Sequence, residues 1–156
     1  MKNKDRSHPF EAAAYGIFVT GPDTRKIIVL KEKGKEYRAL NDSGKPCVSL
    51  QIDGGIIKDK DGSKCDKGLI ILADGTFYLV ELKGVDVSSA CKQLLSTLEQ
   101  FQAELKEWNY EYLCRAVVAG MPAPNNYPAS YRKLMKALKH RKEGVVFKCK
   151  KLEEHI

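Results

Sequence analysis

Two acidic residues and a lysine lie close together in a short segment whose other positions are mostly apolar. The segment Cys65–Gly84 reads CDKGLIILADGTFYLVELKG, with apolar runs on both sides of a central Asp-Gly pair. Asp-Gly between apolar runs favours a tight β-hairpin, because a type I′ turn needs positive φ at both central residues. With those two residues as the loop, Asp66 lies opposite Lys83. Side chains alternate along a strand, so Asp66, Glu81 and Lys83 emerge on one face of the hairpin.

Carboxylates arranged in this way are typical ligands of a hard divalent cation. Mg²⁺ takes one or two carboxylates together with waters and substrate phosphate. Diagonal neighbours on adjacent strands are about 7–8 Å apart, so one Mg²⁺ or Mn²⁺ ion is able to bridge Asp66 and Glu81. Such an ion polarises a phosphoryl oxygen and makes hydroxide available near neutral pH, where Lys83 would orient the water or stabilise the phosphate. The alternative is a plain salt bridge between Asp66 and Lys83, worth about 0.2–1 kcal/mol.

The spacing of these residues resembles the motif of a known group of nucleases. Asp66, fourteen intervening residues and then Glu81-Leu82-Lys83 are similar to the pattern of the PD-(D/E)XK superfamily, although Cys65 stands at the proline position. That superfamily includes restriction endonucleases, Holliday junction resolvases and RecB-type exonucleases. The resemblance implies an α/β restriction-endonuclease-like core, with a mixed central β-sheet flanked by helices. It also implies Mg²⁺-dependent phosphodiester hydrolysis, with Asp66 and Glu81 as metal ligands and Lys83 as a catalytic residue.

Three further residues are candidates for the same site. In nucleases of this type a glutamate from an N-terminal helix often joins the metal site, which makes Glu11 a candidate third ligand. Asp53, which precedes two glycines, is the rival third carboxylate. The related exonucleases carry a glutamine on the helix after Glu-x-Lys, and Gln93 matches that position. The simpler interpretations are a carboxylate on a helix surface for Glu11, a turn residue for Asp53 and an ordinary helical glutamine for Gln93.

Hydrophobic periodicity indicates the elements that must position these residues. A long helix is predicted from about Val87 to Glu107, with Asp86 as its N-cap and one apolar stripe along its length. The strand Tyr110–Ala119 follows, and a strand, a helix and a strand in this order predict a right-handed parallel crossover. A short helix around Glu11 is predicted to pass into a strand. Other predicted strands are Ile27–Leu30, Cys47–Ile52 and Val145–Lys150, whereas the charged tail Lys151–Ile156 is predicted to be loose.

A second predicted helix, Ala129–Lys142, carries many basic side chains on one face. The basic residues that we expect to bind nucleic acid are Arg132, Lys133, Lys136 and Lys139. Lysine and arginine side chains bind the phosphate backbone and release its counterions. The alternative interpretation is that these side chains only solvate a surface helix.

Composition limits the class of protein. The chain of 156 residues, 43% hydrophobic and 30% charged, suits a single globular domain over residues 1–156. Its net charge of +7 suits a polyanionic partner. The five cysteines are odd in number and show no Cys-x-x-Cys spacing, so they predict neither a zinc site nor a disulfide framework and favour the cytoplasm. No stretch approaches about eighteen apolar residues, so we expect no membrane span.

The function expected from the sequence is therefore a Mg²⁺- or Mn²⁺-dependent nuclease, with DNA favoured over RNA as substrate and restriction, defence or repair as its role. The alternative is a catalytically idle protein of the same fold that binds nucleic acid or a protein partner. Endonuclease or exonuclease action, and a homodimer or a partner protein, remain open. The three histidines have no serine or cysteine obviously paired with them, which argues against nucleophile-based and HNH-type hydrolysis. No Walker-type phosphate loop occurs.

Overall fold

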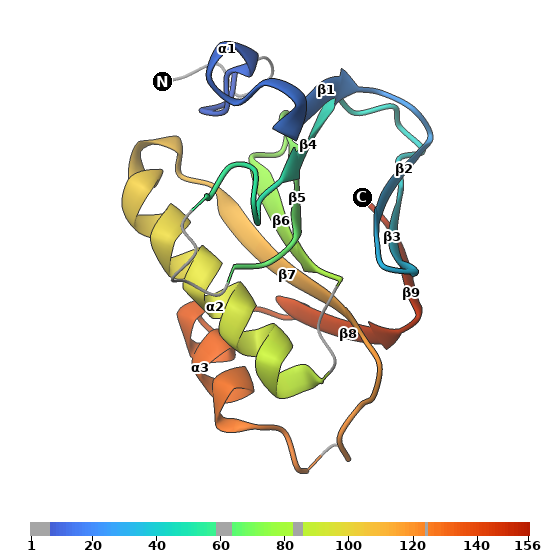
Figure 1. The fold of residues 1–156 in the computed structure, drawn as a ribbon, viewed down its shortest axis with the longest axis vertical. Coiled ribbons are helices and arrows are strands. Elements are labelled where there is room, and N and C mark those ends of the chain that lie inside the picture. The colour runs from blue at the N-terminus through green and yellow to red at the C-terminus, as the bar shows by residue number, and fades with distance from the viewer. Residues whose placement is uncertain (1–6, 59–63, 83–85, 124) are drawn as a thin grey trace.

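A six-stranded mixed β-sheet forms the centre of the molecule (Figure 1). The computed structural model describes residues 7–58, 64–82, 86–123 and 125–156. The strands lie in the order β1-β4-β5-β6-β7-β8. Their bounds are β1 Val19–Asp23, β4 Cys47–Gln51, β5 Lys67–Ile71, β6 Thr76–Glu81, β7 Glu111–Val118 and β8 Val145–Cys149. Each of the first four strands in that order is antiparallel to its neighbour, whereas β6, β7 and β8 run parallel to one another.

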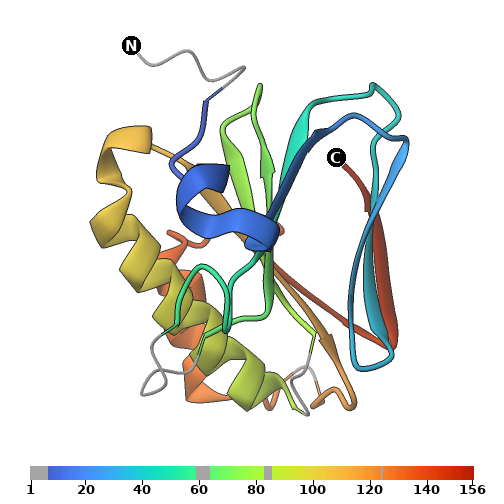
Figure 2. The same cartoon turned by 45° about the horizontal axis from the view of Figure 1, so that its top comes forward.

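Helices α2 (Val87–Glu104) and α3 (Ala129–Ala137) cover one face of this sheet (Figure 2). The predicted N-cap of α2 is confirmed, because Asp86 Oδ1 accepts a hydrogen bond from the Ser89 N–H at 2.8 Å. The predicted apolar stripe is buried from Val87 to Phe101, through Cys91, Leu94 and Leu98. A short 3₁₀ turn, η2 (Lys106–Trp108), follows α2. The predicted parallel pairing of the two strands on either side of α2 is confirmed, since β6 pairs in parallel with β7.

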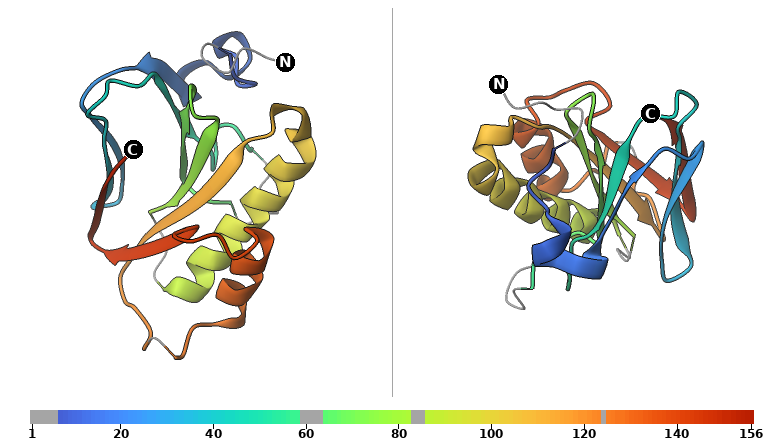
Figure 3. Two further views of the ribbon diagram at one scale, coloured as in Figure 1. Left: turned by 180° about the vertical axis from the view of Figure 1, so that it is seen from behind. Right: turned by 90° about the horizontal axis from the view of Figure 1, so that it is seen from above.

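A second, three-stranded sheet covers the opposite face of the central sheet (Figures 2 and 3). It contains β2 (Ile27–Glu32), β3 (Lys35–Leu40) and β9 (Lys151–His155) in the order β2-β3-β9. The α/β class, with a mixed central sheet and flanking helices, is confirmed; the additional β layer is not predicted by the sequence. The prediction of a loose C-terminal tail is wrong, since the tail forms β9 and pairs in parallel with β3.

Side-chain alternation in the central strands divides the interior into two cores. Ile70, Phe77 and Leu79 face the helices, whereas Leu69 and Val80 face the second sheet. Strands β5 and β6 are thus apolar on both faces, as expected for a sheet that is covered on both sides. A charged side chain at the end of either strand is therefore an exception that calls for a chemical reason.

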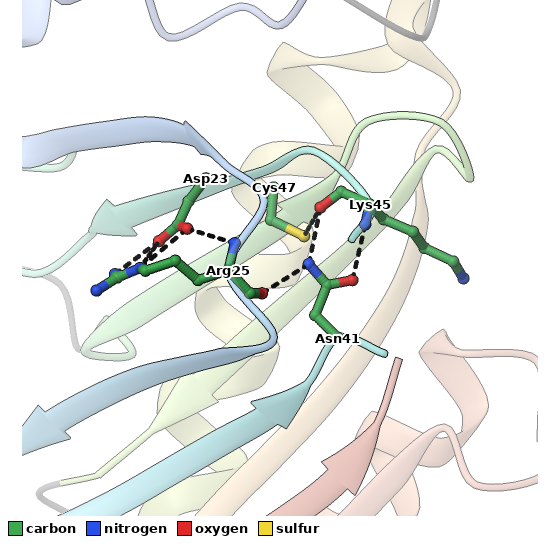
Figure 4. A network of polar contacts seen from close by, with 5 residues as sticks. All are labelled: Asp23, Arg25, Asn41, Lys45 and Cys47. Atoms are coloured by element: carbon green, nitrogen blue, oxygen red, sulfur yellow. Dashed lines mark hydrogen bonds and ion pairs between the residues drawn. The ribbon is translucent and has the colours of Figure 1, made fainter. Parts of the chain in front are cut away.

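Asn41 connects the two sheets where the chain passes between them (Figure 4). Its side-chain Nδ2 donates to the carbonyl oxygens of Arg25 at 3.1 Å and Lys45 at 2.9 Å, and its Oδ1 accepts from the Lys45 N–H at 2.9 Å. Asn41 is fully buried, so its amide takes the place of water for these backbone groups. The neighbouring ion pair between Asp23 and Arg25 lies at the surface and contributes little stability.

The cysteines are free, and all except the exposed Cys149 are buried. Burial raises the pKa of the Cys91 and Cys114 thiols to about 12, so both stay protonated and pack as small apolar side chains. None of the helices that the structure describes is long and apolar enough to cross a membrane.

Candidate active site

The hairpin predicted to carry the site forms, with a longer loop than expected. Ile71 lies opposite Thr76, so residues 72–75 make the turn. The Gly75 N–H donates to the Ile71 carbonyl at 3.0 Å, and Gly75 takes the positive φ of 67° that this turn needs. Leu72 leaves the hairpin ladder because its N–H donates to the Pro46 carbonyl at 3.1 Å and its side chain is buried. The predicted two-residue loop is therefore wrong.

The change of loop shifts the register of the hairpin by an even number of residues. The register differs from the expected one by two residues, since Gly68 lies opposite Leu79 and not opposite Glu81. A shift of two preserves the side of the sheet on which each side chain emerges. The ladder ends at the pair Lys67 and Val80, so Asp66 directly precedes β5 and Glu81 is the last residue of β6 at the same end of the hairpin. The predicted cross-strand pair of Asp66 with Lys83 belongs to the register that is not adopted, and Lys83 itself lies outside the described residues.

Both carboxylates are buried at the end of the hairpin. Asp66 is 2% exposed and Glu81 is 1% exposed. Asp66 Oδ2 accepts a hydrogen bond from the Leu82 N–H at 2.7 Å, and the Asp66 carbonyl accepts one from the Ile52 N–H at 2.9 Å. The position of Asp66 is thus fixed by the backbone N–H that follows β4 and by the backbone N–H that follows β6. Two carboxylates buried side by side cost free energy, and a cation between them offsets that cost.

Helix α2 holds the segment that leads to Asp66. The Cys65 N–H donates to Thr97 Oγ1 at 2.9 Å, and the same hydroxyl donates to the Gln93 carbonyl at 2.9 Å. Thr97 is fully buried. Burial raises the pKa of the Cys65 thiol well above its ordinary value, and the negative charges of Glu81 and Asp66 raise it further. Both carboxylates therefore lie close to the segment that Thr97 anchors.

The predicted glutamine lies one helical turn before this anchor. Gln93 Oε1 is buried and accepts no hydrogen bond from the residues that the structure describes. An enclosed amide oxygen without a donor is suited to a cation or to an ordered water. The oxygens of Asp66, Glu81 and Gln93 are of the hard type that Mg²⁺ and Mn²⁺ prefer, so the chemistry of the residues present fits such an ion.

Replacing Thr97 tests whether the anchor matters. Thr97→Val keeps the shape of the side chain but leaves the buried Cys65 N–H without its acceptor, which should lower the free energy of unfolding by about 1–3 kcal/mol. Thr97→Ser keeps the hydroxyl and should cost less than about 1 kcal/mol. Urea unfolding of the two variants measures the difference. Equal destabilisation by both would show that the methyl group, and not the hydrogen bond, matters at this position.

The structure does not bring Glu11 to the carboxylate pair. Glu11 is exposed and precedes α1 (Ala12–Tyr15), which η1 (Gly16–Phe18) joins to β1. The adjacent Phe10 packs on Phe77, at the beginning of β6, with ring centroids 6.0 Å apart. Glu81 ends the same strand, about 13 Å further along, and Figure 1 shows α1 at the opposite end of the molecule from the beginning of α2.

Asp53 lies nearer to the pair. It follows Ile52, the residue whose N–H donates to the Asp66 carbonyl, and forms an isolated bridge with Ile57. Among the described residues no group of three or more histidine, cysteine, aspartate or glutamate side chains is arranged to hold a metal. Neither Glu11 nor Asp53 therefore completes a three-carboxylate site.

The predicted basic helix is shorter than expected. It ends at Ala137, because Lys139 and His140 take positive φ angles of 56° and 53° and the His140 N–H closes the last turn on the Met135 carbonyl at 2.8 Å. Lys139 consequently lies beyond the helix. The predicted nucleic-acid-binding side chains are all exposed: Arg132, Lys133, Lys136 and Lys139.

Sequence reasoning did not identify Lys64, Cys65 and Thr97 as parts of the site. Lys64 Nζ donates to Ser96 Oγ at 2.9 Å, next to the Thr97 anchor. The sequence does indicate a role for Thr97, since this residue follows Gln93 by four positions and therefore lies on the same side of the helix. No local pattern in the sequence indicates a role for Lys64 or Cys65, because their contacts join segments about thirty residues apart.

Comparisons with known proteins find no match to this chain. No protein-family model matches the chain. Comparisons with curated proteins and with solved structures also find no match. The likeness to PD-(D/E)XK nucleases accordingly rests on the motif in the sequence alone.

Proposed function

We propose that this protein is a Mg²⁺- or Mn²⁺-dependent nuclease that hydrolyses phosphodiester bonds in nucleic acid, with DNA favoured. One observation carries the proposal: Asp66 and Glu81 are both buried at the same end of an otherwise apolar hairpin. Apolar side chains would stabilise the fold at these positions without any desolvation cost. Retaining two acids there fits a role in holding a cation.

The side chains have distinct roles in this proposal. Asp66 and Glu81 supply carboxylate ligands, and Asp66 is positioned in advance by its hydrogen bond from the Leu82 N–H. The Gln93 amide oxygen orients a water or completes the ligand set. When bound, the ion polarises the phosphoryl oxygen and lowers the pKa of a bound water. The catalytic role of Lys83 rests on the resemblance to PD-(D/E)XK nucleases alone.

A hollow lies at the edge of the sheet where the parallel strands end. It has a volume of about 390 Å³ and lies where β7 ends and α2 begins, with Ser88, Met121 and Asn126 among its walls. Glu81 is the last residue of the adjacent parallel strand β6. Ligands of α/β sheets commonly bind outside the carboxyl ends of parallel strands, which supports approach of a phosphodiester from this edge.

A catalytically idle protein of the same fold is the second candidate. The observation that favours it is the low exposure of both carboxylates, 2% for Asp66 and 1% for Glu81. Water and substrate reach such groups only if the surrounding segments open. An idle protein would bind nucleic acid or a partner without cleaving it.

Metal dependence separates the two candidates. We expect cleavage of duplex DNA, single-stranded DNA or RNA with millimolar Mg²⁺ or Mn²⁺ and no cleavage in EDTA. An ion present at about 100 times its Kd should also stabilise the native state by about 2.7 kcal/mol, which raises the Tm by roughly 5–10 °C in a domain of this size. Gel assays and differential scanning fluorimetry measure the two effects. An unchanged Tm together with intact substrates would support the idle protein.

A further inference from the structure

A polar groove runs between α2 and α3. Its volume is about 420 Å³. The polar side chains in its walls are Ser88, Lys92, Ser96, Glu99, Ser130 and Lys133. Two lysines and three hydroxyl groups face one carboxylate, so the walls favour an anionic ligand that accepts hydrogen bonds.

The rotation of α3 about its axis decides which of its basic residues reach this groove. Ser130 Oγ donates to the Ser88 carbonyl at 3.1 Å, which turns that flank of α3 toward α2. Lys133 follows Ser130 by three residues and shares the flank. Lys136 lies two positions past the buried Leu134 and points away from the core. The basic residues predicted to act together are thus separated, and Lys133 is the one that lines the groove.

Lys64 links the groove to the carboxylate pair. Its Nζ donates to Ser96 Oγ, which forms part of the groove wall. Lys64 also precedes Asp66 by two residues, and Cys65 between them is anchored to Thr97. Positive charge therefore extends from α3 across α2 to the site. Lys64, Lys92 and Lys133 against Glu99 leave a net charge of 3 − 1 = +2 along this path.

We propose that the groove between α2 and α3 binds the sugar-phosphate backbone of nucleic acid and directs it toward Asp66 and Glu81. This inference rests on the proposed function, since it names the surface that delivers substrate to the same site. Lysines bind phosphates as point charges, and the hydroxyls of Ser88 and Ser96 are able to donate to phosphate oxygens. Arg132 and Lys136, on the outer face of α3, do not line this groove and contribute general positive potential.

Two matched double variants test the proposal. Lys92→Gln with Lys133→Gln and Arg132→Gln with Lys136→Gln each remove two charges from exposed positions. Binding of fluorescein-labelled duplex DNA is measured by anisotropy in EDTA at several NaCl concentrations. The groove variant should lower the slope of log K against log salt by up to about 1.8, because each phosphate contact contributes about 0.9. The outer-face variant should change the slope by less than about 0.5.

The outcomes separate the groove from the nuclease activity. Three results would each contradict the proposal that the groove binds nucleic acid: equal effects of the two variants, no effect of the groove variant, or no binding by the wild-type protein. Specific loss of binding in the groove variant supports it, even if the wild-type protein cleaves nothing with Mg²⁺ or Mn²⁺. Absence of cleavage by the wild-type protein would contradict the proposed nuclease function and leave the binding role of the groove intact. Circular dichroism of both variants checks that they remain folded.

Discussion

Glu81→Gln should lower the rate of cleavage by on the order of 10³-fold, because a metal ligand of this kind supplies several kcal/mol of transition-state stabilisation. The substitution keeps the size of the buried side chain and removes its charge. Affinity for nucleic acid should change by less than about twofold, since phosphate contacts supply most of the binding free energy. Initial rates at saturating Mg²⁺ and binding isotherms in EDTA measure the two quantities separately.

Asp66→Asn should act in the same way and should also remove the Mg²⁺-dependent rise in Tm. Its amide oxygen can still accept the hydrogen bond from the Leu82 N–H, so the variant should fold. Glu104→Gln is a matched control, because Glu104 is an exposed carboxylate at the far end of α2. Cleavage that persists at the wild-type rate in Glu81→Gln would remove the carboxylate pair from the reaction.

Glu154→Ala should lower the free energy of unfolding by about 3 kcal/mol, because it leaves a buried arginine without its counter-ion. Arg115 Nε donates to Glu154 Oε1 at 2.7 Å, and only 4% of the Arg115 side chain is exposed. The Tyr37 hydroxyl donates to the same oxygen at 2.7 Å. This pair joins β9 to the central sheet, so its loss should loosen the C-terminal strand. Urea or thermal unfolding measures the effect.

A second substitution separates the ion pair from the packing around it. Arg115→Met combined with Glu154→Leu removes both charges, and the double variant should be more stable than Glu154→Ala, because no buried charge is left unpaired. Tyr37→Phe should cost about 1.5–3 kcal/mol, as expected for a hydrogen bond to a charged group. A loss below about 1 kcal/mol in Glu154→Ala would show that Arg115 finds another partner or solvent.

Local chemistry in the sequence was sufficient for several features. Asp86 begins α2 and the apolar stripe of that helix is buried, since a cap and a helical period involve only neighbouring residues. The common face of Ile70, Phe77 and Leu79 was predicted correctly although the loop was not. A strand alternates with period two, so an error of two residues in register leaves every side chain on its predicted face.

Contacts between distant segments decided what the sequence could not show. The tail of the chain has too few apolar residues to indicate a strand, yet Leu152 is buried and Glu154 meets Arg115 once β9 pairs with β3. Phe10 packs on Phe77 and thereby places Glu11 at the wrong end of β6 for a metal ligand.

The same reason applies to the candidate site. Cys65 is held by Thr97, and Lys133 rather than Lys136 lines the groove, because of how α2 and α3 pack on the sheet and on each other. Residue types and spacing determined which side chains could bind a cation or a phosphate. The tertiary structure alone decided which of them lie together, since each such contact joins segments that no local pattern connects.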